Sequence, residues 1–232
     1  MPNELSTVLA DELSLPSVAD ALPSDFNRAR FVQNTMALIN ENDDLRKRPQ
    51  SELIPGLLKG AFLGLDFFNK ECYLIPYGSE LKFTVDYKGM MKLVKKYSVR
   101  PVADIYARIV REGDEYSEEI VNNEPKINFK PKEFNNGKIK GAFAICIYKD
   151  GGAKVETMSF EQLEQAKKMS QAQTGTAWKF FSDEMYKKIV IRRLCKGIPI
   201  ELENSTQDAV MNNEYVETTA VAVEEEVNPF DE

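Results

Sequence analysis

The chain has 232 residues, 43% of them hydrophobic, and a formal net charge of −7. This length suits one good-sized domain or two small ones, and no apolar run approaches the 18 or so residues that a membrane-spanning helix needs. The sequence contains no histidine, which excludes Ser-His and Cys-His nucleophile pairs and histidine-ligated zinc.

The first quarter of the chain is predicted to be helical after a short leader. Residues 1–22 are interpreted as a flexible leader or a weakly packed helix, because Pro16 and Pro23 interrupt regular structure there. Apolar residues at helical spacing predict a helix over 26–40. A second helix is predicted over 51–66, where Ser51 is a suitable N-cap.

Two stretches of alternating side chains predict a β-hairpin over residues 72–88. Tyr73, Ile75 and Tyr77 alternate along the first stretch, and Leu81, Phe83, Val85 and Tyr87 alternate along the second. Lys82 and Lys88 then lie on the opposite face of the second strand, because successive side chains of a strand alternate. After Gly89 a lysine-rich helix is predicted over 90–97.

The middle of the chain is predicted to consist mainly of strands. These cover 101–112, 126–130, 138–148 and 153–158. Ser159 followed by Gln162 has the spacing of a capping box and predicts a helix that ends near residue 169. This order of elements predicts an α+β fold in which helices cover an antiparallel sheet.

The stretch from Trp178 to Lys196 is predicted to form one helix with two apolar faces. One is an ordinary core face of Phe180, Val190, Ile191, Leu194 and Ile198. The other begins with Trp178, Phe181 and Met185 and continues as Lys188, Arg192 and Lys196. An edge that begins aromatic and ends cationic suits a single nucleic-acid strand, because bases stack and phosphates are charged. In the competing interpretation, the aromatic residues are core and the cations are a solvated helix end.

The charges are divided unevenly along the chain. Residues 201–232 hold ten acids and residues 1–22 hold four, with no lysine or arginine in either segment. The remaining segment, 23–200, therefore has 23 of the 37 acids against all 30 bases, a net charge of +7. A basic body between acidic ends is compatible with phosphate binding, although acidic ends also serve solubility alone. We predict one core over 23–200 and a disordered acidic tail over 201–232.

Sequence motifs for nucleotide or metal chemistry are absent or weak. Neither a GxxxxGKS/T phosphate loop nor a GxGxxG turn after a strand occurs, so nothing supports the use of ATP. The three cysteines are far apart and predict neither a disulfide framework nor a metal knuckle, and the N-terminus lacks a secretion signal; both favour the cytoplasm. A carboxylate-bound Mg²⁺ ion stays compatible with the sequence. The carboxylates considered for a metal-dependent nuclease, the less favoured alternative, are Asp86, Asp104, Asp114 and Glu115.

Five segments of the chain carry a resemblance to a known family. In chain order they are SELIPGLLKGAFLGLD, ECYLIPYGSELKFTVDYKGMMKLVKKY, REGDEY, IKGAFAICIYKDGG and FFSDEMYKKIVIRRLCKGIPI. They resemble the RecT family of phage single-strand annealing recombinases, and the resemblance covers about residues 22–200. One departure is the FFN at 67–69, where shorter and more polar residues are expected.

The resemblance implies a function without covalent catalysis. RecT-like proteins bind single-stranded DNA, assemble into rings or helical filaments and anneal complementary strands without ATP; some also promote strand invasion. The expected partners are therefore single-stranded DNA, the annealed duplex intermediate, further copies of the chain, a phage 5′→3′ exonuclease and a host single-strand binding protein. No membrane partner and no required cofactor are expected, and the expected location is the cytoplasm of a bacterial host.

Annealing needs a surface that holds phosphates and leaves bases free to pair. The predicted DNA-binding residues are Lys82, Tyr87, Lys88, Lys92, Arg108, Arg111, Trp178, Phe181, Lys187, Lys188, Arg192, Arg193 and Lys196. Core burial stays open for Tyr87, which is in register with the apolar face of the hairpin, and for Trp178, because a large aromatic at a helix start often closes a core. A passive single-strand coating protein would share this surface and is the main alternative.

Overall fold

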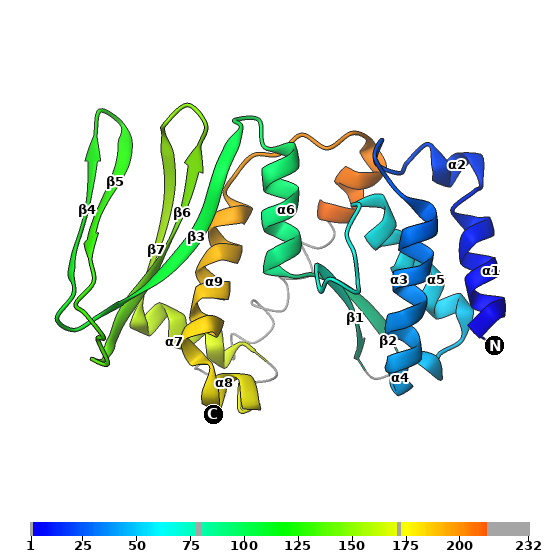
Figure 1. Ribbon diagram of the computed structural model, residues 1–232, viewed down its shortest axis with the longest axis horizontal. Coiled ribbons are helices and arrows are strands. Elements are labelled where there is room, and N and C mark those ends of the chain that lie inside the picture. The colour runs from blue at the N-terminus through cyan, green and yellow to red at the C-terminus, as the bar shows by residue number, and fades with distance from the viewer. Residues whose placement is uncertain (1, 78–79, 171–172, 213–232) are drawn as a thin grey trace, which may run out of the picture. The chain divides into compact units, whose positions relative to one another are not determined.

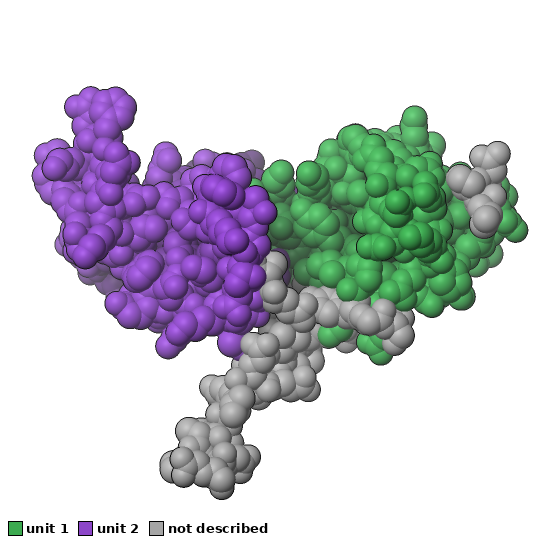
Figure 2. All heavy atoms as spheres, turned by 90° about the horizontal axis from the view of Figure 1, so that it is seen from below, with its two compact units in different colours: residues 1–90, 202–232 green, residues 91–201 purple. Residues whose placement is uncertain are grey.

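The computed structural model describes residues 2–77, 80–170 and 173–212 (Figure 1). The chain divides into two compact units (Figure 2), which are residues 1–90 with 202–232 and residues 91–201. Helices and antiparallel sheets make up both units, which confirms the predicted α+β class. Within the described ranges, no helix has the length and apolar character needed to cross a membrane.

The first unit is built largely from helices. They are α1 (Pro2–Glu12), α2 (Pro16–Ala19), α3 (Arg28–Glu41), α4 (Asp43–Arg46) and α5 (Gln50–Phe62). Leu9 and Leu13 are fully buried against this unit. The segment expected as a flexible leader is therefore a packed part of the fold, because leucines four residues apart give it one apolar stripe.

The beginning of the predicted acidic tail also belongs to this unit. Residues 205–212 are helical, and Gln207, Val210 and Met211 are buried. Glu203 accepts a hydrogen bond from the Ser24 backbone N–H at 2.8 Å, so the segment is tied to the start of the chain. The disordered tail predicted from residue 201 is thus wrong for 201–212, and residues 213–232 lie outside the described part of the chain.

A β-hairpin completes the first unit, as predicted. Strand β1 (Cys72–Tyr77) pairs antiparallel with β2 (Glu80–Val85), with Leu74 opposite Phe83. Phe83 is buried against Phe67, whose ring centroid is 6.2 Å away. Phe67 belongs to the FFN that departs from the expected pattern, and its complete burial explains why a large apolar residue occupies that position.

The second unit has a three-stranded antiparallel sheet and a separate hairpin. The sheet order is β3 (Val102–Arg111), β6 (Ile139–Tyr148) and β7 (Ala153–Ser159), and the hairpin is β4 (Glu115–Val121) with β5 (Glu124–Lys130). Strand β4 was not predicted, because its side chains are polar on both faces and no alternation marks it. Tyr116 anchors it, with its ring 5.6 Å from that of Phe143 in β6.

Helices cover one face of this sheet. Helices α7 (Phe160–Lys168) and α9 (Ser182–Lys196) pack on it, α8 (Thr176–Phe180) packs on α9, and α6 (Tyr87–Tyr97) leads into the unit. The predicted capping box opens α7: Gln162 N donates to Ser159 Oγ at 3.3 Å, and Ser159 N donates to Gln162 Oε1 at 3.0 Å. Helix α9 packs across all three strands.

The three cysteines give a direct test of this packing. Cys72, Cys146 and Cys195 are all buried and free, and burial, followed by the charge of Cys146, raises the pKa of Cys195 to about 12. Because a buried, protonated thiol is a poor nucleophile, we expect none of the three to react with a thiol reagent at pH 8 before unfolding. Counting titrated thiols with and without denaturant checks this, and rapid labelling of the native protein would contradict it.

Candidate nucleic-acid interface

The predicted DNA-binding residues fall in both units. Lys82, Tyr87 and Lys88 belong to the first unit, and the others belong to the second. The two groups are described separately, because each unit forms its own body.

The YKG segment differs from its predicted geometry. Strand β2 ends at Val85, and Tyr87 and Lys88 lie in the first turn of α6 rather than on the strand. Asp86 caps this helix by accepting from the Lys88 N–H at 3.3 Å. A Cβ at Gly89 would lie 2.2 Å from the Glu71 carbonyl oxygen, so only glycine fits where the helix starts against the chain before β1.

This geometry separates the three candidates of the first unit. Lys88 is exposed, Tyr87 is half-buried and Lys82 is half-buried on β2. Tyr73, on the neighbouring strand, has its pKa raised to about 12 by burial and then by the negative charge of Asp86. Because Tyr87 lies in α6 and not on β2, it does not belong to the alternating apolar face that the sequence suggested.

The single helix predicted over 178–196 is broken at Phe181, whose φ and ψ are −133° and 38°. The break separates α8 from α9 and rotates their faces relative to a continuous helix. Phe180, predicted as core, is 75% exposed, whereas Val190, Ile191 and Leu194 are buried as predicted. The edge that was to begin with Trp178 and end with Lys196 is therefore not one continuous stripe.

Trp178 is a core residue in this structure. It is 5% exposed, and its ring centroid lies 5.4 Å from that of Tyr186. The Lys167 ammonium lies 5.4 Å from the centroid of the Trp178 ring. Because the indole is almost completely buried, it offers no open face for a base, unlike Phe181, which is 61% exposed.

Three predicted cations of the second unit are held in ion pairs. Arg193 Nε lies 2.7 Å from Glu156 Oε1, Lys187 pairs with Glu184, and Arg111 pairs with Asp183. The Arg111 pair joins the end of β3 to the start of α9, and Arg111 Nη1 also donates to the Gly137 carbonyl at 2.7 Å. Arg111 thus positions three segments of the fold rather than standing on an open surface.

The other cations of α9 form a row spaced four residues apart. Lys188 and Arg192 are half-buried, and Lys196 is exposed. The segment after this helix is tied to the end of α6, because Glu201 N donates to the Tyr97 carbonyl at 2.8 Å and Val99 N to that of Pro199 at 3.3 Å.

Helix α6 adds further cations at this end of the unit. Its lysines at 92, 95 and 96 are exposed. The Lys95 side chain donates to Asp104 at 3.1 Å, and this hydrogen bond lowers the pKa of Asp104. Two helices whose C-terminal ends are joined therefore each bring cations to the same region, which is an arrangement that attracts phosphate.

Arg108 lies on the other side of the sheet from α9. Ala107, its neighbour in β3, pairs with Ala144, and Ala144 pairs with Glu156, which contacts Arg193 of α9. Since side chains alternate along a strand, Arg108 points to the opposite face. There its guanidinium lies 5.8 Å from the ring centroid of the partly exposed Tyr106. The structure therefore does not bring Arg108 together with the α9 cations.

The carboxylates of the nuclease alternative are engaged separately. Asp104 bonds to Lys95, Glu115 pairs with Lys130 at 3.1 Å, and Asp114 accepts from the Asn135 side chain at 2.7 Å. In the described ranges, no three acidic or cysteine side chains come together as a metal-binding group. Each of these three carboxylates instead has a visible structural contact.

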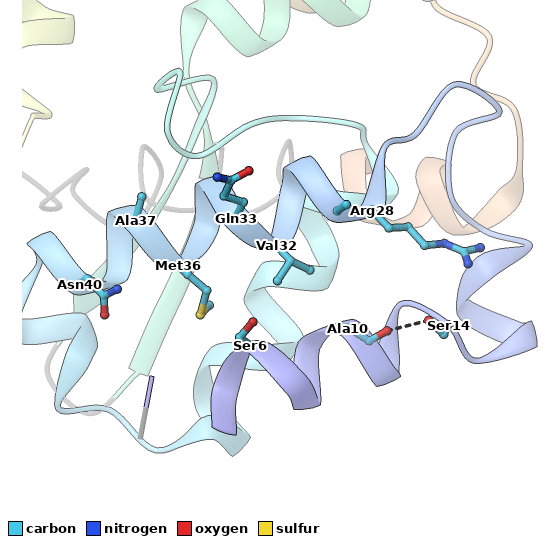
Figure 3. Close-up of a pocket in the computed structure, with 10 residues that line it drawn as sticks. Ser6, Ala10, Ser14, Arg28, Val32, Gln33, Met36, Ala37 and Asn40 are labelled. Carbon is cyan, nitrogen blue, oxygen red and sulfur yellow. Dashed lines mark hydrogen bonds between the residues drawn. The ribbon is translucent and has the colours of Figure 1, made fainter. Parts of the chain in front are cut away.

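Among the described residues of the first unit, hollows that the sequence did not reveal lie at two places. One, of about 540 Å³, lies between α1 and α3, where Val32 and Met36 point toward Ser6 and Ala10 (Figure 3). The other, of about 710 Å³, has an apolar floor and is edged by the basic cluster at 46–48. That cluster is visible in the sequence, but its apolar neighbours come from α1, α3 and α5.

Comparison with known proteins agrees with the resemblance. The model of the RecT family matches residues 29–229. The chain is also 29% identical over 196 residues to Protein RecT of Escherichia coli (strain K12), an alignment that covers 80% of this chain and 72% of the relative. Because the family model matches most of the chain, the protein belongs to the RecT family, whose members bind DNA and anneal single strands in recombination.

Proposed function

We propose that this protein binds single-stranded DNA and anneals complementary strands without ATP, in homologous recombination of a phage. The observation that carries the proposal is the row of cations on α9, at the joined ends of α6 and α9, in a chain of the RecT family. Strand invasion into a duplex is a further activity that we assign to the same surface.

The proposed mechanism relies on binding alone, since annealing breaks no covalent bond. Lysine and arginine side chains would hold the phosphates and release counterions, which makes affinity fall steeply with salt. Bases would be left outward and able to pair with a second strand. Mg²⁺ is not required in this scheme, because the protein's own cations neutralise the backbone charge.

We further propose that the protein acts as a homo-oligomer, either a ring or a helical filament. One chain of this size covers few nucleotides, so pairing of long strands needs protomers side by side. A phage 5′→3′ exonuclease would supply the single strands, and a host single-strand binding protein would compete for them in the cytoplasm. Light scattering with and without DNA tests the assembly, and a strict monomer in both states would contradict it.

The decisive experiment is annealing of two complementary dye-labelled oligonucleotides in the absence of ATP. We expect the protein to accelerate pairing relative to the oligonucleotides alone. Binding that leaves pairing slower or unchanged would instead identify a passive coating protein. Shortening of the strands when Mg²⁺ is added would identify a nuclease.

A further inference from the structure

Large aromatic rings are unusually exposed in the second unit. Phe134 is 89% exposed, Phe180 is 75% exposed and Phe181 is 61% exposed, while Phe160 is partly exposed. Single exposed apolar residues are normal, but a group of large apolar side chains marks a surface that another molecule covers. Of these residues, only Phe181 was suggested by the sequence.

The phenylalanines belong to segments that meet at one end of the unit. Arg111 donates to the carbonyl of Gly137, in the loop of Phe134, and also pairs with Asp183, two residues after Phe181. Ser159, the residue before Phe160, pairs with Gly141 at the start of β6. In Figure 1 the β5–β6 connection, the start of α7 and the α8–α9 junction all lie along the lower side of residues 91–201.

Hydrogen bonds hold the loop that carries Phe134 in a strained backbone conformation. Phe134 has a φ of 48°, a left-handed conformation that bulky residues rarely adopt. Asp114 accepts from Asn135 Nδ2 at 2.7 Å and from the Lys132 N–H at 2.9 Å, and the Gly137 N–H donates to Asn135 Oδ1 at 2.8 Å. A Cβ at Gly137 would lie 2.6 Å from the Glu112 carbonyl oxygen.

This network holds the apolar ring of Phe134 in solvent, where its exposure does not stabilise the fold. Strain that the surroundings impose on an exposed residue points to a use at that residue. The same network gives Asp114 a structural part: it holds the Phe134 loop in place.

The charge around these rings indicates the kind of partner. Residues 130–140 contain four lysines and one glutamate, and all of these side chains are exposed. Lys179, beside Phe180, is also exposed. Protein–protein interfaces are depleted in lysine, whereas surfaces for single-stranded nucleic acid combine aromatic rings with lysine and arginine. Phenyl rings among lysines therefore suit bases and phosphates better than a second copy of the chain.

We propose that Phe134, Phe180 and Phe181 stack on bases of the bound DNA strand, with the lysines of residues 130–140 on its phosphates. Stacking on a phenyl ring holds a base without reading its sequence, because every base has a flat face. The inference rests on the proposed function and adds to it a base-contacting surface that is separate from the α9 cations.

The test is the triple variant F134A/F180A/F181A, assayed for binding to a fluorescent oligo-dT at fixed salt. We expect its affinity to fall at least about a hundredfold, because each of the three lost stacks should weaken binding about fivefold or more. The slope of affinity against salt should stay unchanged, because no phosphate contact is removed. Affinity for an oligonucleotide of abasic sites should stay the same as that of the unaltered protein, since it has no bases to stack.

Matched controls are F68A and I120A, which remove exposed apolar side chains outside this surface. Both should bind oligo-dT like the unaltered protein, and circular dichroism should confirm that every variant folds. Unchanged oligo-dT affinity of the triple variant would overturn the inference, as would loss of self-association without DNA, which would make the rings a contact between protomers. Failure of the unaltered protein to bind single strands would instead overturn the proposed function.

Discussion

Replacing Trp178 with alanine is expected to lower the free energy of unfolding by about 3–5 kcal/mol, as for other large aromatic residues removed from a core. Trp178 is buried and contacts Tyr186 and Lys167, and alanine would leave a cavity that the surrounding side chains fill only in part. Urea denaturation followed by far-ultraviolet circular dichroism measures the change.

The variants W178F and F181A make this prediction specific. Within the described residues the indole N–H of Trp178 has no hydrogen-bond partner, so phenylalanine keeps most of the packing and loses no bond. F181A, at an exposed ring, should change stability by no more than about 0.5 kcal/mol. Trp178 would regain a direct part in binding if W178A were as stable as the unaltered protein yet bound single strands more weakly.

Because the chain has one tryptophan, its fluorescence reports on this site alone. A buried indole should emit at short wavelength and resist quenching by iodide, both with and without DNA. Strong quenching by bound single strands would indicate that a base reaches the ring and would contradict the core assignment.

The variant R192A/K196A is expected to weaken binding of single-stranded DNA by at least about tenfold at moderate salt, because hydrogen bonds to charged groups contribute more than neutral ones. Both cations lie on the row along α9. Each lost phosphate contact on a single strand should also make the slope of log affinity against log salt shallower by about 0.7, or about 1.4 for two. A salt titration of oligonucleotide binding gives both quantities.

Two control variants distinguish a specific role of the α9 row from a general effect of net charge. K126A/K149A removes the same charge from exposed lysines on other parts of the second unit, and it should leave the slope unchanged. R193A removes a neighbouring cation that pairs with Glu156 at 2.7 Å. It should lower the free energy of unfolding by about 0–1 kcal/mol and change the affinity for single-stranded DNA little. Equal loss of affinity in all three variants would mean that net charge, and not the α9 row, determines binding.

Contacts in the fold give a structural role to two residues that the sequence suggested for chemistry. Arg111 and Asp114 were candidates for phosphate and metal binding, yet Arg111 pairs with Asp183, and Asp114 holds the Phe134 loop. Both are polar groups near a surface, where sequence shows charge but not partners. The Arg111–Asp183 and Asn135–Asp114 hydrogen bonds connect positions 72 and 21 residues apart in the chain, separations that no local pattern reveals.

Local signals determined much of the fold. The capping box at Ser159, a hairpin over 72–88 and a strand over 138–148 were predicted because turn chemistry, capping and side-chain alternation act within a few residues, and all three are present, although the hairpin ends at Val85. The family and the general class of function also followed from the sequence, since the diagnostic segments are contiguous.

Only the tertiary structure decided which side chains are covered. The break at Phe181 buries Trp178 and exposes Phe180, against the faces of a continuous helix. Strand β4 exists because it pairs with β5 and packs Tyr116 on Phe143, not because of its own pattern. The sequence by itself determined most of the chain's elements, its basic body and its family, because these depend on composition and on neighbours in the chain. The candidate DNA-contacting rings depended on the fold, because exposure is set by contacts between segments that are distant in sequence.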